Sequence, residues 1–328
     1  MIDAILAGVM PDAILAGAMP EVILAGAMAD AILAVVVGGG AVLQAGLLAE
    51  IVEMLSTRFM QYALLAGVCV GIAGPLLGSY LVHRELSLIG EALAHTAFAG
   101  VGLGFLVVAL FGVSAARVDA VALSVALGVA VLAALGMQLL AVETDAYGDV
   151  PVAVMLTGGF ALGILVINLD FVRLSGSIDD YLFGNIVLLD RNSALLMALL
   201  ALVIVGVVLA AHKQLAYITF DREAASMARI DVRLYDTLLV VLTAGFVVAA
   251  MYIMGAILVA AMLVVPVAAA TLLVTGFRRS MVVAVGIGQI SVLVGISSSF
   301  IYGLQAGAMI VMVAIAFYFA AVTRSVLR

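Results

Sequence analysis

Long runs of apolar residues, separated by short polar stretches, follow one another from Phe59 to the C-terminus. The runs are continuous, whereas a barrel strand facing lipid would alternate apolar and polar residues, so they predict α-helices. Each run is about long enough to cross about 30 Å of hydrocarbon. The pattern therefore predicts a polytopic bundle of nine transmembrane helices, near residues 60–82, 88–111, 118–142, 152–173, 193–211, 235–253, 255–275, 281–301 and 304–323.

The first part of the chain follows a different pattern. Residues 1–34 form a near-repeat of nine in which ILA triplets recur, and Pro11 and Pro20 interrupt any helix there. No Lys or Arg precedes Arg58, so the charged start of a secretory signal is lacking. We expect residues 1–50 to be a low-complexity hydrophobic extension, in which 22–43 could add a tenth span, and 51–328 to be the main domain.

Composition supports a membrane protein and excludes several other classes. Hydrophobic residues make up 67% of the chain and charged residues 10%, with a mean hydropathy of +1.39, whereas a soluble domain is about half apolar and a quarter charged. The net charge of −7 leaves no basic patch for nucleic acid. Cys69 is the single cysteine, which excludes an intrachain disulfide and a thiolate metal cluster.

The distribution of basic residues predicts the orientation of the spans. Two predicted spans separate each basic group from the next, so all three groups can face the cytoplasm together with the C-terminus. Nine spans would then place Arg58 outside, and a tenth would return the N-terminus to the cytoplasm. The three groups are Lys213, Arg222, Arg229 and Arg233; Arg278 and Arg279; and Arg324 and Arg328.

Two loops carry further predictions. Residues 175–192 are too polar and too interrupted by Gly184 for a plain span, so we expect a short or re-entrant helix there, facing out. Residues 211–233 form a sizeable polar segment in which Asp221 can cap a helix over 222–228, with Glu223 in its first turn. A capped helix in a cytoplasmic loop suits a docking surface.

The candidate chemistry lies in the stretch LSLIGEALAHTAFAG, residues 86–100. Glu91 and His95 are four residues apart, so they project from one face of a helix. An ionisable group at membrane depth costs at least about 2.5–3.5 kcal/mol, which argues for a use, and we predict metal passage. Carboxylate and imidazole suit Mn, Zn or Fe(II). A structural pair that joins two helices without touching metal is the alternative.

Five segments in the same order resemble the membrane permeases of ATP-binding-cassette importers for zinc, manganese and iron. Glu91 stands where the family usually has aspartate, which extends the carboxylate by one methylene. The family's Asp and Pro near the last spans are absent, since Gly303 and Gln305 follow Ser299 and Phe300. The segments are MLSTRFMQYALLAG (54–67), HRELSLIGEALAHTAFAG (83–100), YLFGNI (181–186), HKQLAYITFDREAASMARI (212–230) and GAILVAAMLVVPVAAATLL (255–273).

The resemblance implies a type II importer permease in the plasma membrane, working as a homodimer around one pathway. It also implies two cytoplasmic ATPase subunits, an extracytoplasmic metal-binding protein, and a divalent metal as cargo, with no cofactor of the permease itself. Two copies of Glu91 and His95 would then supply four ligands to a weak relay site. The segment implied to contact the ATPase comprises Phe220, Asp221, Arg222, Glu223, Ala224, Ala225, Met227 and Arg229.

A nucleotide-binding GxxxxGK[ST] loop is absent from the sequence, so we expect ATP hydrolysis on a partner rather than on this chain. Three alternatives stay open: a permease for a metal chelate such as a siderophore or cobalamin, an intramembrane metalloenzyme, and a structural scaffold exposed to lipid. The enzyme would need a third ligand near the pair, as in HExxH, and none is present.

Smaller features carry predictions of their own. We expect His83, Arg84 and Glu85 to form a polar turn at the membrane surface. We expect His212 to contact the ATPase side or lipid headgroups. Pro75 and Pro266 should kink or break their helices. Glycine pairs four residues apart, at 67 and 71, 100 and 104, and 303 and 307, fit close helix packing.

Overall fold

The structure is a computed structural model that describes residues 56–114, 117–143, 150–169 and 191–327. Over these ranges it is all-helical, and nine of its helices are long and apolar enough to cross a membrane. The predictions for residues 1–50 and 175–192 lie outside the described residues. The helices are α4 (Arg58–His83), α5 (Ile89–Phe111), α6 (Val118–Glu143), α7 (Val150–Ile167), α9 (Arg191–Ala210), α10 (His212–Phe220), α11 (Arg222–Met227), α12 (Val232–Met254), α13 (Ala256–Leu273), α14 (Phe277–Tyr302) and α15 (Ala306–Val326).

Each of the nine predicted spans overlaps one of the nine long helices, so the all-α polytopic fold is confirmed. The segment 211–233 was predicted to hold one short helix, but it holds two, because α10 continues almost directly from α9. Apolar side chains of α10 explain this: Leu215 and Ile218 are buried against the bundle.

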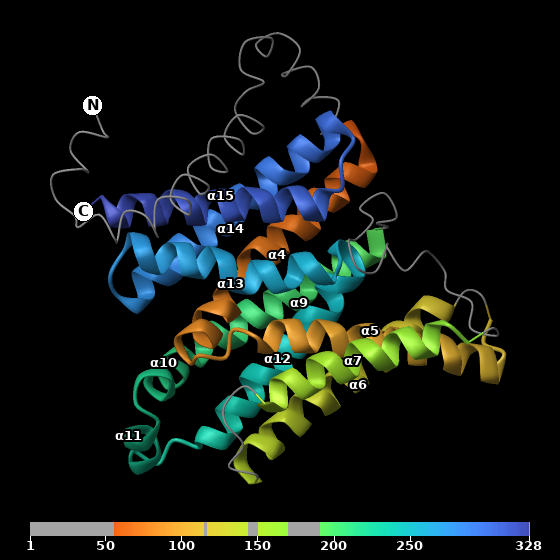
Figure 1. The fold of residues 1–328 in the computed structure, drawn as a ribbon, viewed down its shortest axis with the longest axis horizontal. Helices are drawn as coiled ribbons and strands as arrows, with labels where there is room; N and C mark the ends of the chain where they lie inside the picture. The colour runs from red at the N-terminus through yellow and green to blue at the C-terminus, as the bar shows by residue number, and fades with distance from the viewer. Residues whose placement is uncertain (1–55, 115–116, 144–149, 170–190, 328) are drawn as a thin grey trace, which may run out of the picture.

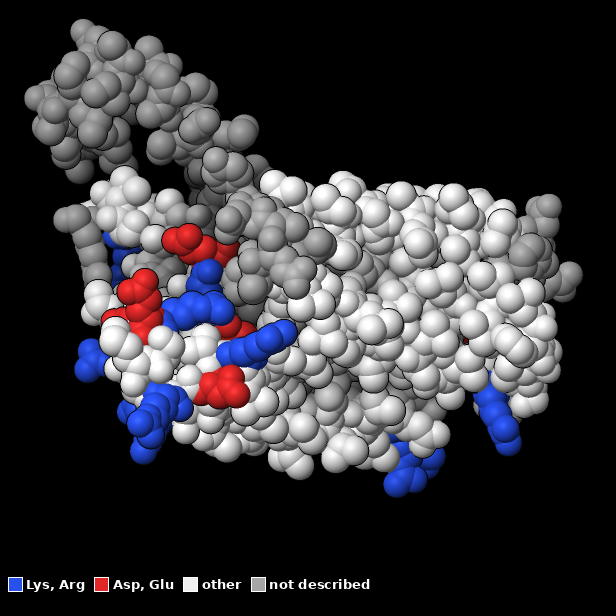
Figure 2. Space-filling model, turned by 90° about the horizontal axis from the view of Figure 1, so that it is seen from below, with Lys and Arg blue, Asp and Glu red and all other residues white. Residues whose placement is uncertain are grey.

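The helices lie side by side along one direction, and α11, the turn between α13 and α14, and the C-terminus lie at the same end (Figure 1). We call this the basic end, because its helices carry Lys213, Arg222, Arg278, Arg279 and Arg324. On the face seen in Figure 2, many of the charged side chains gather at one end and most of the remaining surface is uncharged. Helix α4 begins at the opposite end from the C-terminus, as nine spans require (Figure 1).

Glycines let the central helices approach closely. A Cβ added at Gly67 or Gly71 of α4 would lie 2.7–2.8 Å from side-chain atoms of α14, and one at Gly100 or Gly104 of α5 would lie 2.5–2.6 Å from backbone atoms of α6. These two pairs confirm the prediction of close packing. The prediction is wrong for Gly303, which has open space around it and ends α14 with a φ of +65°.

Neither proline breaks its helix. Pro75 lies inside α4 and Pro266 inside α13, and both helices continue past them. Next to Pro75, a Cβ on Gly288 of α14 would lie 2.7 Å from the proline ring and 2.8 Å from the carbonyl oxygen of Gly71. That oxygen is the one that a proline at position 75 deprives of its helical N–H donor. The missing side chain at Gly288 therefore lets α14 pack closely against the point where α4 lacks this hydrogen bond.

Candidate metal site

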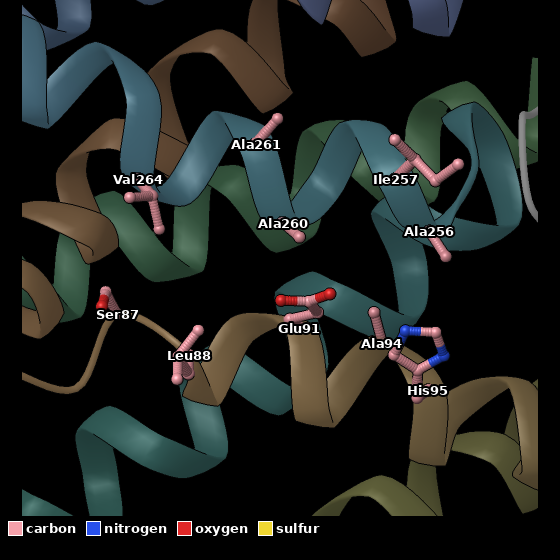
Figure 3. A pocket seen from close by; sticks show the side chains of 10 residues that line it. All are labelled: Ser87, Leu88, Glu91, Ala94, His95, Ala256, Ile257, Ala260, Ala261 and Val264. Atoms are coloured by element: carbon pink, nitrogen blue, oxygen red, sulfur yellow. The ribbon is translucent and has the colours of Figure 1, made fainter. Parts of the chain in front are cut away.

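Glu91 and His95 lie in the first turns of α5, on the face turned toward α13 (Figure 3). They border a cavity of about 330 Å³ between the two helices. The α13 wall runs from Ala256 to Val264, the first half of that helix, and the opposite wall runs from Ser87, just before α5, to His95. The lining residues are Ser87, Leu88, Glu91, Ala94, His95, Ala256, Ile257, Ala260, Ala261 and Val264.

The α13 wall supplies space rather than chemistry. Its side chains are three alanines, an isoleucine and a valine, none of which can bind an ion. The carboxylate of Glu91 and the imidazole of His95 stand opposite this wall, with Ala94 between them (Figure 3). The side chains of the cavity that could bind an ion therefore come from α5, and α13 contributes an apolar wall, mostly of small side chains.

The two side chains are available to a ligand. No hydrogen bond or ion pair joins Glu91 to another described residue, and Nδ1 of His95 is buried without a hydrogen-bond partner among them. A pair that held two helices together would show such a bond, so the geometry weighs against the structural alternative. The role of Glu91 and His95 in binding an ion stays a prediction.

Helix α7, which sequence reasoning did not connect to the site, positions His95. The ring of Phe160 lies edge-on to the imidazole, with 5.0 Å between ring centroids. Gly159 makes this approach feasible, because a Cβ there would lie 2.9 Å from the backbone nitrogen of Thr96. The adjacent glycines 158 and 159 were the available signal, but only the three-dimensional packing shows which helix they face.

One chain supplies too few ligands for a complete metal site. Within the described ranges there is no group of three or more His, Cys, Asp or Glu side chains placed to hold an ion. Glu91 and His95 provide one carboxylate and one imidazole, whereas zinc normally takes four ligands and manganese takes more. Any tight coordination would therefore need donors from outside the described part of this chain.

The predicted capped helix within the segment implied to contact a partner is confirmed, and it lies at the basic end. The contact itself stays a prediction. The carboxylate of Asp221 accepts a hydrogen bond from the backbone N–H of Ala224 at 2.8 Å, and α11 follows. Phe220, the last residue of α10, is 65% exposed, and Met227, the last residue of α11, is 78% exposed. Arg222, Glu223 and Arg229 are also exposed, whereas Ala224 is half-buried and Ala225 is fully buried, so Ala225 anchors the helix and offers no contact surface.

Arg84 differs from its prediction. The turn after α4 exists, but the Arg84 side chain is only 9% exposed and does not lie on a polar surface. Its Nη1 pairs with Asp236 of α12 at 2.8 Å, and its Nε donates to Thr219 of α10 at 2.9 Å. Sequence reasoning missed Asp236 entirely, because a lone aspartate near the start of a span resembles an ordinary interfacial charge.

His212 also differs from its prediction, because its ring bonds within the chain. Nε of Arg278 donates to Nε2 of His212 at 3.2 Å, so the neutral ring carries its proton on Nδ1. That N–H donates to the hydroxyl oxygen of Tyr80, with 2.6 Å between the two atoms. Burial, and then the positive charge of Arg278, lower the pKa of His212 below its usual value near 6.5.

Comparisons with known proteins agree with this architecture. The manganese transport system membrane protein MntC of Listeria monocytogenes is 29% identical over 268 residues, covering 82% of this chain and 91% of that protein. A probable iron transport system membrane protein of Haemophilus influenzae is 26% identical over 281 residues, covering 85% and 98%. The solved structure of PsaBC from Streptococcus pneumoniae in complex with Fab matches with a TM-score of 0.72 and 25% identity, covering 84% of this chain and 95% of that one.

The model of the family described as the ABC 3 transport family matches residues 56–325. This range runs from the residues before α4 to the last turn of α15, so it includes all nine spans. The resemblance to importer permeases and the placement as a multi-pass protein of the plasma membrane are thereby confirmed. This chain belongs to the ABC 3 transport family.

Proposed function

We propose that this chain is the permease subunit of an importer for a divalent transition-metal ion, with manganese and iron as the first candidates and zinc as the third. The observation that carries the proposal is that Glu91 and His95 border one cavity between α5 and α13, where Glu91 has no hydrogen-bond or ion-pair partner among the described residues and Nδ1 of His95 has no hydrogen-bond partner. Relatives named for manganese and iron transport support the choice of ions. A carboxylate with an imidazole is a donor set that both metals accept.

A second copy of the chain completes the pathway. Glu91 is exposed in the isolated chain although it lies within a membrane span. A carboxylate that faced hydrocarbon at the centre of a span would cost about 2.5 kcal/mol or more, so we infer that the open side of the cavity faces water or protein. A second permease facing it would contribute its own carboxylate and imidazole and bring the donors to four. Such a site is weak because it opens whenever the two copies separate.

Energy comes from separate ATPase subunits that bind at the basic end. Phe220 and Met227 expose apolar side chains beside the charged residues of α11, a combination that fits a groove on a partner better than water. An extracytoplasmic metal-binding protein would deliver the ion at the opposite end. In this arrangement the permease itself catalyses no reaction, and its role is to alternate access to the cavity.

The test is uptake of radioactive manganese or iron by proteoliposomes that contain the complete complex. Glu91→Gln and His95→Gln each remove a donor with little change in size, and we expect uptake to fall at least about tenfold. Asp119→Asn is the matched control, because Asp119 is an exposed carboxylate at the start of α6, away from the cavity. Its uptake should equal that of the wild type.

Two results would overturn the proposal. Normal uptake by both cavity variants, in complexes that assemble fully, would remove Glu91 and His95 from the ion path. Transport of a ferric chelate in place of the free ions by the wild-type complex would assign the chain to chelate import instead. Competition among manganese, ferrous and zinc ions in the same vesicles would rank the three metals.

A further inference from the structure

Asp236, near the start of α12, joins two arginines that belong to different parts of the chain. Its Oδ1 pairs with Nη1 of Arg84 at 2.8 Å and its Oδ2 with Nη2 of Arg222 at 2.6 Å. The Asp236 side chain is 14% exposed, so both ion pairs meet at a carboxylate that is largely shielded from water. Shielding strengthens the pair with Arg84, whose side chain is 9% exposed, more than the pair with Arg222, whose side chain is 67% exposed.

Arg84 connects this carboxylate to the helix that carries the candidate metal site. Its backbone ends α4, and the chain turns sharply at Glu85, where φ is +61°. The residues that follow lead directly into α5: Ser87 and Leu88 line the cavity, and Glu91 lies in the first turn. The guanidinium also donates to the carbonyl oxygen of Leu215 in α10 at 3.2 Å, so Arg84 fixes the turn against two further helices.

Arg222 connects the same carboxylate to α11. It is the first residue of that helix, directly after the Asp221 cap. Its side chain is 67% exposed, in contrast to that of Arg84, so it reaches Asp236 from the outside of the cluster. The chain of contacts from α11 to the cavity is therefore continuous: Arg222, then Asp236, then Arg84 and the turn before α5.

We propose that Asp236 is a positioning residue that transmits displacement of α11 to the turn between α4 and α5, and so to the cavity wall that bears Ser87, Leu88 and Glu91. The inference rests on the proposed function, in which an ATPase subunit moves α11. When α11 shifts, the link through Arg222 and Asp236 moves Arg84 with it, because one carboxylate bridges the two guanidinium groups, with one oxygen on each. Without the link, α11 moves while the cavity stays in place.

Arg222→Gln tests this link with little risk to folding. The exposed arginine contributes little to stability, and its removal leaves the buried pair of Arg84 and Asp236 neutral and intact. In proteoliposomes with the complete complex, we expect the number of ions imported per ATP hydrolysed to fall at least about fivefold. The ratio is measured per assembled complex, because Arg222 also belongs to the segment proposed to contact the ATPase subunits. Lys213→Gln is the control, because it removes an equal charge from an exposed position on α10. It should leave the ratio of ions imported to ATP hydrolysed unchanged.

Asp236→Asn gives an independent reading, because the largely buried carboxylate offers the ATPase little contact surface. It should lower the number of ions imported per ATP hydrolysed as Arg222→Gln does. The double variant should have the same ratio as the single variants, since both substitutions break the same link. If Asp236→Asn does not fold, Arg222→Gln alone decides. A wild-type ratio in Arg222→Gln would overturn the inference. Release of the ATPase subunits would also overturn it, because Arg222 would then act as a docking contact.

These outcomes are distinct from failure of the proposed function. If the wild-type complex imports no manganese, iron or zinc, the function is wrong whatever the variants do. If the wild type imports the ion and Arg222→Gln imports it with the same ratio, the function stands and the link does not transmit motion.

Discussion

A close approach between the backbones of α4 and α13 allows a sharp test of the packing. Gly78 of α4 faces the peptide of Leu263, and an alanine Cβ at position 78 would lie 1.8 Å from the carbonyl oxygen and 2.7 Å from the carbonyl carbon. Ordinary van der Waals contact begins near 3.4 Å, so the two backbones would have to separate by about 1.6 Å. Gly78→Ala should therefore destabilise the protein. The neighbour is backbone, which cannot rotate away as a flexible side chain can.

The magnitude follows from two opposing contributions. Overpacking in a well-packed core costs about 1–3 kcal/mol, and a clash between two backbones belongs at the upper end, about 3 kcal/mol. Alanine in a helix gains about 1 kcal/mol over glycine, which leaves a net loss of about 2 kcal/mol. At an unfolding entropy of about 2.1 cal/mol/K per residue, each kcal/mol lowers the melting temperature of a 328-residue chain by about 1.5 °C, so we expect a decrease of about 3 °C.

Gly206→Ala is the matched control. Gly206 lies inside α9 and nothing approaches its added Cβ within 4 Å, so only the helix propensity changes. This variant should gain at most about 1 kcal/mol and melt no more than about 1.5 °C higher than the wild type. The two substitutions are chemically identical, yet the structure predicts opposite signs.

Cys69 provides the assay. It is the single cysteine of the chain and it is buried in α4, so a thiol-reactive fluorescent dye reports its exposure as the purified protein is heated in detergent. The midpoint of the fluorescence rise should fall for Gly78→Ala and rise or stay level for Gly206→Ala. If Gly78→Ala melts at or above the wild-type temperature, α4 and α13 do not approach as closely as the structure places them.

Two further predictions concern the basic end. The pKa of His212 is lowered in the folded protein, so as the pH falls the unfolded chain binds a proton at this residue before the folded chain does. The contribution of His212 to the free energy of unfolding should therefore be full above about pH 6.5 and be lost as the pH falls below it. Melting curves of His212→Gln should show a weaker fall over this range. Equal pH dependence in both proteins would contradict this. Asp221→Ala should lose about 1 kcal/mol of capping energy in α11 and weaken binding of the ATPase subunit about fivefold in a titration. Asp221→Asn can still cap the helix and should therefore lose less. Equal losses of affinity in the two variants would argue against the cap.

The spans were predictable because the membrane imposes one rule on all of them. Backbone groups inside hydrocarbon must be satisfied within the segment, so each crossing is a continuous apolar helix that the sequence displays directly. The cap at Asp221 was equally local, since the bond spans three residues. Predictions failed where the deciding contact was distant in sequence. Arg84 and Asp236 are 152 positions apart, and Tyr80 and His212 are 132 apart.

The candidate site was only half predictable for the same reason. Glu91 and His95 stand out in an apolar run, because a charged or titratable residue there is rare. The opposite wall, Ala256 to Val264 of α13, carries no such signal, since its alanines look like any other part of a span. Phe160 was likewise indistinguishable from a lipid-facing phenylalanine until α7 was placed against α5.

Leu263 brings these separate features together. Its backbone meets Gly78 of α4, and its side chain lies 2.5 Å from where a Cβ on Gly90 of α5 would stand, next to Glu91. Its neighbour Val264 lines the cavity. Glycine on both sides lets α13 approach α4 and α5 closely, and the Leu263 side chain packs over Gly90. The spacing of these three helices therefore sets the width of the cavity beside Glu91. The turn that begins at Arg84, six residues beyond Gly78, joins α4 to α5 at the same place.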